Sequence, residues 1–176
     1  TTRFLLRLRD EHPVMRPAAF ASGRPANGDE IADLAWYRAD GVPMDTDAWH
    51  DPWTRVIQML RNGGPLADND LLVVINGWLD QVDVTLPDGH GTDWHLSWDS
   101  TWAVPRPHTS AFALAHRVSR GAARTREIRP AQDRPPRSAE CRHDRPGDTT
   151  TLDALSMRIY LSGEVLEPRE GRPTTP

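Results

Sequence analysis

The chain has 176 residues, which is enough for one domain, and its hydrophobic content of 38% allows only a modest core. The net charge of −4 argues against nucleic acid as a partner, and no apolar run reaches the roughly 20 residues of a membrane-spanning helix, so no membrane association is expected. The single cysteine, Cys141, excludes an internal disulfide and fits a cytoplasmic protein.

Charge and aromatic residues are unevenly distributed along the chain. Residues 1–103 carry 8 Arg and 16 acidic residues, a net charge of −8, whereas residues 104–145 carry 10 Arg and 4 acidic residues, a net charge of +6. All seven tryptophans lie between residues 36 and 102. The chain has no lysine, which a GC-rich coding sequence explains. We therefore expect the folded part to end near residue 103 and residues 104–176 to be a disordered tail.

The first predicted element is a short helix over residues 2–12. Phe4, Leu5 and Leu8 lie on one side of this helix, and Pro13 ends it. A helix this short is not stable alone, so it must pack on another element, which the sequence does not identify. The opening residues have neither a signal-peptide pattern nor an initiator methionine, which suggests a processed product or the tail of a longer protein.

A strand and a second short helix are predicted next. Residues 31–39 predict a strand with mixed faces. A turn and a short helix follow, with Thr46 as the N-cap and Asp47 near the positive end of the helix. Pro52 ends or bends this segment.

Further antiparallel strands are predicted over residues 54–62, 71–78, 81–87 and 93–101, from alternating hydrophobic residues in all but the second, which is β-branched and apolar on both faces. The short link between the second and third of these strands suggests a hairpin, and together they suggest a meander whose apolar face must be covered. Farther on, Met157, Ile159 and Leu161 alternate, which indicates a short strand that would stand alone. The fold class is therefore mainly β.

Three neighbouring aspartates are the first candidates for chemistry. Asp45, Asp47 and Asp51 lie close in sequence, and two carboxylates at the right separation can cleave a glycosidic bond. Aspartate is also ordinary at the start of a helix, so we interpret all three as capping and surface residues. The sequence therefore predicts no catalytic residue.

Metal and nucleophile candidates are weaker. The histidines and aspartates that could approach a metal are His50, Asp51, His90, Asp93 and His95. No HExxH or CxxC spacing supports them, so no metal site is predicted. Cys141 has His143 two residues on, but catalytic pairs are spatial rather than sequential, so no nucleophile is predicted.

Tryptophans offer a different kind of site. An exposed aromatic face stacks on a sugar ring because the C–H face of a pyranose is apolar. Trp49 and Trp53 are spaced i, i+4, so both could line one helical face. The alternative, that these tryptophans fill a small sheet core, is favoured by the residues alone. Trp49 and Trp53 remain the candidate carbohydrate contacts.

Four segments combine spacing and turn residues in an unusual way. They are LLRLRDEHPVMRPAAFASGRP (5–25), DLAWYRADGVPMDTDAWHDPW (33–53), LLVVINGWLDQVDVTLP (71–87) and WHLSWDST (94–101). In this order they resemble bacterial glycogen debranching enzymes of the isoamylase type, which belong to the alpha-amylase superfamily. The first segment resembles the last helix of the catalytic barrel and its exit, and the others resemble the C-terminal strands that follow.

The resemblance implies a fold and an activity. It implies that residues 1–25 are the end of the barrel, that residues 26–103 form an antiparallel β-sandwich-like C-terminal domain, and that residues 104–176 are a tail. The implied enzyme hydrolyses α-1,6 branch linkages of glycogen or limit dextrin by a retaining mechanism, in the cytoplasm and without a cofactor. The catalytic carboxylates of the family lie on earlier barrel strands, and no residue of this chain matches those motifs.

The main departure from the family comes after residue 103. The family has further strands there, and without them the sandwich would be incomplete. A frameshift in a GC-rich gene would produce the arginine- and proline-rich sequence that stands there instead. Three interpretations stay open: a non-catalytic C-terminal fragment with a catalytic barrel as partner and α-glucan as ligand, a free-standing carbohydrate-binding module, or a non-functional pseudogene product. The helix over residues 2–12 disfavours the free-standing module, which would not begin with half of a barrel unit.

Overall fold

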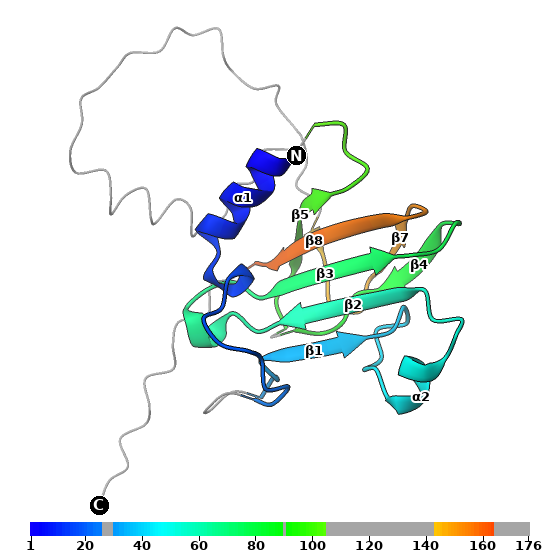
Figure 1. Ribbon diagram of the computed structural model, residues 1–176, viewed down its shortest axis with the longest axis horizontal. Coiled ribbons are helices and arrows are strands. Elements are labelled where there is room, and N and C mark those ends of the chain that lie inside the picture. The colour runs from blue at the N-terminus through cyan, green and yellow to red at the C-terminus, as the bar shows by residue number, and fades with distance from the viewer. Residues whose placement is uncertain (26–29, 90, 105–142, 164–176) are drawn as a thin grey trace, which may run out of the picture.

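The computed structural model describes residues 1–25, 30–89, 91–104 and 143–163 (Figure 1). The helices are α1 (Thr2–Glu11), η1 (Pro13–Met15), α2 (Thr46–His50) and η2 (Gly64–Leu66), where η denotes a 3₁₀ turn. The strands are β1 (Leu34–Tyr37), β2 (Val56–Arg61), β3 (Leu71–Asn76), β4 (Val82–Thr85), β5 (Trp94–Asp99), β6 (His143–Asp144), β7 (Thr149–Leu152) and β8 (Ser156–Ser162). The helix predicted over residues 2–12 and the strands predicted before residue 103 are thus present.

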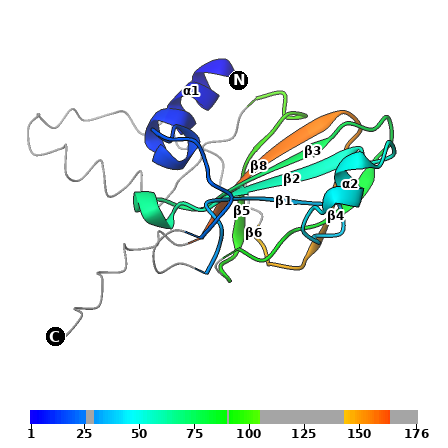
Figure 2. The ribbon, with the colours of Figure 1, turned by 60° about the horizontal axis from the view of Figure 1, so that its bottom comes forward.

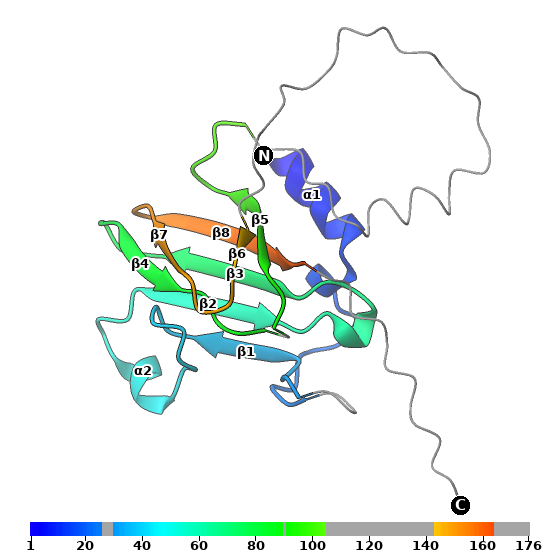
Figure 3. The same cartoon turned by 180° about the vertical axis from the view of Figure 1, so that it is seen from behind.

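The strands form two antiparallel sheets that pack face to face. The larger sheet has six strands in the order β1-β2-β3-β8-β5-β6, and the smaller sheet pairs β4 with β7. Figures 2 and 3 show β4 and β7 on one side of the larger sheet. The prediction of a mainly β, antiparallel, sandwich-like fold is confirmed.

The larger core cluster lies between the two sheets. Alternation along β2 puts its even-numbered residues on this side, with a strict buried and half-buried pattern. Trp94 at the start of β5 is fully buried there, and its Nε1 donates a hydrogen bond to the Pro87 carbonyl at 3.0 Å. The buried residues of this cluster are Val56, Leu60, Leu72, Val74, Val84, Leu86, Trp94, Leu152 and Tyr160.

The opposite face of the larger sheet is covered in part by α1. Leu8 and Val14 are buried against a second cluster, which contains Leu71, Trp98 and Ile159. Figure 1 shows α1 beside β5 and β8, whereas α2 lies at the other edge of the sheet near β1. The partner that the short N-terminal helix needs is therefore this face of the sheet.

The strand expected to stand alone is central to the fold. Ser156–Ser162 forms β8, which pairs with β3 on one side and β5 on the other. Tyr160 enters one core cluster, and Ile159 and Leu161 enter the other. The expected tail therefore differs from the structure over residues 143–163, which belong to the sandwich, while residues 105–142 and 164–176 lie outside the described residues.

The expected hairpin between β3 and β4, and with it a simple meander, is also wrong. β3 pairs with β8, and β4 crosses to the smaller sheet. Asn76 provides the physical reason. Its amide nitrogen donates to the carbonyls of Asp80 and Asp153 at 2.9 Å each, and its Oδ1 accepts from the Trp78 amide. These bonds redirect the chain after β3 toward the turn that precedes β8.

Candidate functional site

Polar residues lie at both ends of the sandwich, and the two ends differ in exposure. At the end where β2 stops and β3 starts, His12 and Asp68 have fully buried side chains, and we call this the closed end. At the opposite end, where β2 starts and β3 stops, a pocket of about 540 Å³ opens to solvent, and we call this the open end. The open end is the candidate site because polar groups there can reach a ligand.

At the closed end, buried polar groups bond to one another and to the backbone. Nδ1 of His12 lies 2.8 Å from Oδ1 of Asp68, whose Oδ2 accepts a hydrogen bond from the Val14 amide at 2.9 Å. Asp70 accepts a hydrogen bond from the Gly63 amide at 2.9 Å, and a side chain on Gly63 would collide with the Asn69 carbonyl. This end therefore has a structural role, since it joins α1 and η1 to the sheet.

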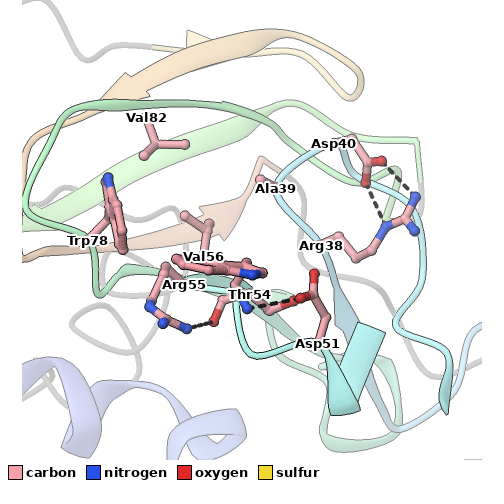
Figure 4. Close-up of a pocket in the computed structure, with 10 residues that line it drawn as sticks. Arg38, Ala39, Asp40, Asp51, Thr54, Arg55, Val56, Trp78 and Val82 are labelled. Carbon is pink, nitrogen blue, oxygen red and sulfur yellow. Dashed lines mark hydrogen bonds and ion pairs between the residues drawn. The ribbon is translucent and has the colours of Figure 1, made fainter. Parts of the chain in front are cut away.

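Four segments form the walls of the pocket at the open end. They are the turn after β1, the link from α2 to β2, the turn after β3 and the start of β4. Val56 and Val82 supply apolar surface, and the labelled side chains in Figure 4 show charged groups around it. The antiparallel pairing of β2 with β3 brings the link from α2 to β2 next to the turn after β3. At this point the Gly77 amide donates a hydrogen bond to the Arg55 carbonyl at 2.8 Å.

Two tryptophans flank a guanidinium group in this pocket. The Cζ atom of Arg55 lies 6.0 Å from the ring centroid of Trp53 and 5.6 Å from that of Trp78. Such distances allow a cation–π attraction to each ring. The Trp78 indole nitrogen donates to Asp80 at 3.1 Å, which holds the ring, while Trp53 remains 75% exposed. The pocket thus has one fixed aromatic group and one ring that faces solvent.

The charged groups of the pocket are arranged by local turns. Arg38 donates two hydrogen bonds to Asp40, from Nη2 at 2.7 Å and from Nε at 3.2 Å (Figure 4). These hydrogen bonds from Arg38 lower the pKa of Asp40, and the same bonds raise the pKa of Arg38. Gly41 follows with a φ of 77°, so the Asp-Gly pair makes the tight turn that presents these side chains. Asp40 therefore stays ionised at neutral pH.

The two predicted carbohydrate contacts have separate positions. Trp53 lines the pocket, but Trp49 packs edge-on against Trp36 with ring centroids 5.7 Å apart. They do not share a helical face, because α2 ends at His50 and Asp51 has extended backbone angles. The sequence patterns did not single out Trp78 as a pocket residue, nor Arg38, Asp40 and Arg55. The antiparallel pairing of β2 and β3 was a usable signal for Trp78.

The three aspartates near α2 act locally, as predicted. Asp45, rather than the expected Thr46, is the N-cap, and its side chain accepts from the Ala48 amide at 2.8 Å. Asp47 lies in the first turn of the helix. Asp51 accepts from the Trp53 amide at 2.9 Å, which fixes the start of the link to β2 (Figure 4).

The remaining candidates offer no built site in the described part of the chain. No group of three or more His, Cys, Asp or Glu residues is placed there to hold a metal ion. His50 donates through Nδ1 to the Thr46 carbonyl at 2.7 Å within its own helix. His90, Cys141 and the side chain of His143 lie outside the described residues. None of the helices described is long and apolar enough to cross a membrane.

Comparison with known proteins finds a family model and several relatives that are similar to part of this chain. Residues 33–118 match the family model described as isoamylase, C-terminal. The chain is 31% identical over 105 residues to an isoamylase of Flavobacterium sp, an alignment that covers 57% of this chain and 14% of that protein. It is 33% identical over 98 residues to an isoamylase of Pseudomonas amyloderamosa, covering 54% of this chain and 12% of that protein.

A third relative has a different name. The chain is 28% identical over 99 residues to a glycogen operon protein GlgX homolog of Mycobacterium bovis, covering 49% of this chain and 14% of that protein. The chain therefore spans between 12% and 14% of the length of these curated relatives. The resemblance to the C-terminal part of an isoamylase-type debranching enzyme is confirmed.

Proposed function

We propose that this chain, whose residues 33–118 match the isoamylase C-terminal family model, acts as the C-terminal domain of a cytoplasmic enzyme that hydrolyses α-1,6 branch linkages in glycogen or limit dextrin. In this proposal the chain supports a catalytic barrel and contributes no catalytic carboxylate. The observation that carries it is the half-covered apolar face of the larger sheet, on which α1 already packs.

The carboxyl groups support a non-catalytic role. A retaining glycosidase needs two carboxyl groups about 5–5.5 Å apart, one of them with a raised pKa so that it can donate a proton. Among the described residues, the three carboxyl groups with a shifted pKa are Asp33, Asp40 and Asp99, and all three pKa values are lowered. None of these three suits a general acid. Asp51 in the pocket accepts a backbone hydrogen bond and acts as a local turn residue.

The apolar face supports a barrel as the partner. Ile57, Ile75 and Met157 lie side by side across β2, β3 and β8, and all three are half-buried. Ile57 and Ile75 belong to neither core cluster, so α1 does not complete the cover of this row. A half-open apolar row beside a docked helix is the kind of surface that an obligate neighbouring domain buries.

The same face disfavours a free-standing module. A separate carbohydrate-binding module would have to keep this row in water, at a cost of about 25 cal/mol for each Å² of apolar area. It would also have to keep α1 and η1, which are joined to the sheet by the buried pair of His12 and Asp68. The half-covered row and the docked α1 and η1 are both explained if the sandwich follows a catalytic barrel in the same chain and packs on it.

A chimaera tests the proposal. The matched C-terminal region of the Flavobacterium sp isoamylase is replaced by this chain, and release of linear chains from glycogen is measured. We expect the chimaera to debranch glycogen and the 176-residue chain alone to show no hydrolysis. Ile75→Asp in the chimaera should abolish activity through loss of docking, whereas Trp49→Ala, which lies outside this row and outside the pocket, should leave the hydrolysis of small branched substrates unchanged. Hydrolysis by the isolated chain, or a folded but inactive chimaera, would contradict the proposal.

A further inference from the structure

The open end holds a feature that domain docking does not explain. Trp53 is 75% exposed, yet tryptophan is among the residues that gain most from burial. The pocket beside it is lined by residues at the open end of the sandwich. Its lining includes neither Ile57 nor Ile75 of the half-covered face. We propose that this pocket binds a short stretch of α-1,4-linked glucan, with the Trp53 ring as its stacking platform.

The aromatic groups fit one face of a sugar. A pyranose ring has an apolar C–H face and a rim of hydroxyl groups, so it packs flat on an exposed indole. Trp53 supplies an indole from the link to β2, and Trp78 supplies a second indole from the turn after β3. Arg55 lies within 6.0 Å of both ring centroids and keeps the two rings near each other. Two aromatic groups on separate segments can engage successive sugar units.

The polar groups fit the hydroxyl rim. Asp51 uses Oδ1 to accept from the Trp53 amide, which leaves Oδ2 able to accept from a hydroxyl group. Arg55 donates through Nη1 to the carbonyls of Pro52 and Thr54, and these bonds fix the position of its guanidinium group. Its Nε and Nη2 can still donate to the hydroxyl groups of a sugar. These groups are exposed, so a ligand can reach them without opening the core.

Charge balance points to a neutral ligand. The pocket contains two arginines, Arg38 and Arg55, and two aspartates, Asp40 and Asp51. Arg38 and Asp40 form an ion pair with each other, so neither sign dominates. A phosphate would meet two carboxylates and an ammonium ion would meet two guanidinium groups, whereas a neutral polyol can bond to both kinds of group.

The dimensions of the pocket also suit a saccharide. Its volume of about 540 Å³ lies within the range of about 300–1,000 Å³ that is typical of small-molecule sites. Val56 and Val82 form apolar surface inside it, so one side of a sugar can be desolvated. The choice of an α-glucan rests on the proposed function, whereas the assignment of a saccharide site rests on the pocket itself.

Affinity electrophoresis of the full 176-residue chain through gels that contain glycogen tests the inference, with maltoheptaose titration followed by tryptophan fluorescence. We expect glycogen to retard the chain and Trp53→Ala to weaken maltoheptaose binding by about tenfold or more. Trp49→Ala is the matched control, because Trp49 is 52% exposed on the preceding helix but packs on Trp36 outside the pocket. This control should bind like the parent chain, and both variants should keep a cooperative thermal transition.

Three results would overturn the inference. They are absence of retardation, equal binding by the parent chain and Trp53→Ala, and equal loss in both tryptophan variants. Equal affinity for cellohexaose and maltoheptaose would remove the α-glucan assignment. The chimaera distinguishes this inference from the proposed function: an inactive chimaera with intact maltoheptaose binding rejects the function alone, and an active chimaera whose Trp53→Ala variant binds normally rejects the pocket alone.

Discussion

The closed end and the open end of the sandwich are built from similar residues but have opposite exposure. At the closed end, Asp68 and His12 are fully buried and paired. At the open end, Asp51 and Arg55 are exposed and keep hydrogen-bonding capacity, and Trp53 faces solvent. Exposure, rather than residue type, distinguishes the end whose polar groups can reach a ligand from the end whose polar groups are buried. The same residue types stabilise one end and form a candidate binding site at the other.

The largest expected effect breaks the closed end. Asp68→Ala removes the partner of a buried histidine and the acceptor of the Val14 amide, so it should lower the free energy of unfolding by about 3–5 kcal/mol. Urea unfolding of the parent chain and the variant measures this loss. A loss below about 1 kcal/mol would contradict the structural role of the pair.

An intermediate effect concerns a third polar site, inside the sandwich. Arg158 donates to Asp99 at 2.6 Å and to Thr150 at 2.9 Å, which ties β8 to β5 and β7. Burial alone would raise the pKa of Asp99, but hydrogen bonds from Thr101 and Arg158 hold it below its usual value. A lowered folded-state pKa means that this stabilisation is present at neutral pH and is lost as the pH falls below about 4.

The substitution Asp99→Asn isolates this contribution. We expect it to lower the free energy of unfolding at pH 7 by about 1–3 kcal/mol, since a buried charged hydrogen bond is weakened. The difference from the parent chain should shrink between about pH 4 and pH 2, as Asp99 is protonated in the parent. Urea unfolding at several pH values gives both quantities. A difference that is independent of pH would show that the charge of Asp99 is unimportant.

The smallest effect sharpens the comparison at the open end. Asp51→Ala removes an exposed acceptor that serves the Trp53 amide, so the free energy of unfolding should change by no more than about 1 kcal/mol. The same urea titration that reports on Asp68→Ala measures it. If Asp51→Ala lowered the free energy of unfolding as much as Asp68→Ala does, the open end would also have a structural role. The exposed Asp51 carboxylate would then be explained without a ligand.

Much of the fold was predictable from local pattern. Alternation located β2 and β5, and a β-branched apolar run located β3. The helix that ends before Pro13 was found because its apolar residues share one side. The position of β8 was not predictable, because alternation identifies a strand but not its partners. β8 pairs with β3 and β5, which are far from it in sequence. The polar sequence of residues 105–142 lies between β5 and β8 and gave no sign that the two strands are neighbours. Asn76 likewise redirects the chain through side-chain bonds that no periodicity reveals.

The candidate site was predictable only in part. Trp53 was recognised as an exposed aromatic candidate, but its expected companion was Trp49, which assumed that the helix continues past His50. The actual companion, Trp78, comes from the turn after the neighbouring strand. Register decides such contacts, since β2 and β3 pair Val56 with Asn76 and so bring the segments that flank them together. Spacing along one segment cannot replace that information.

Hydrogen–deuterium exchange of the full chain, with and without maltoheptaose, tests the contrast between the two ends most directly. We expect maltoheptaose to slow amide exchange at the open end, in residues 53–55 and 77–82. We expect residues 68–71 at the closed end to exchange slowly whether or not the sugar is present. Protection by maltoheptaose at the closed end, or no change at the open end, would contradict the assignment of one end to structure and the other to binding.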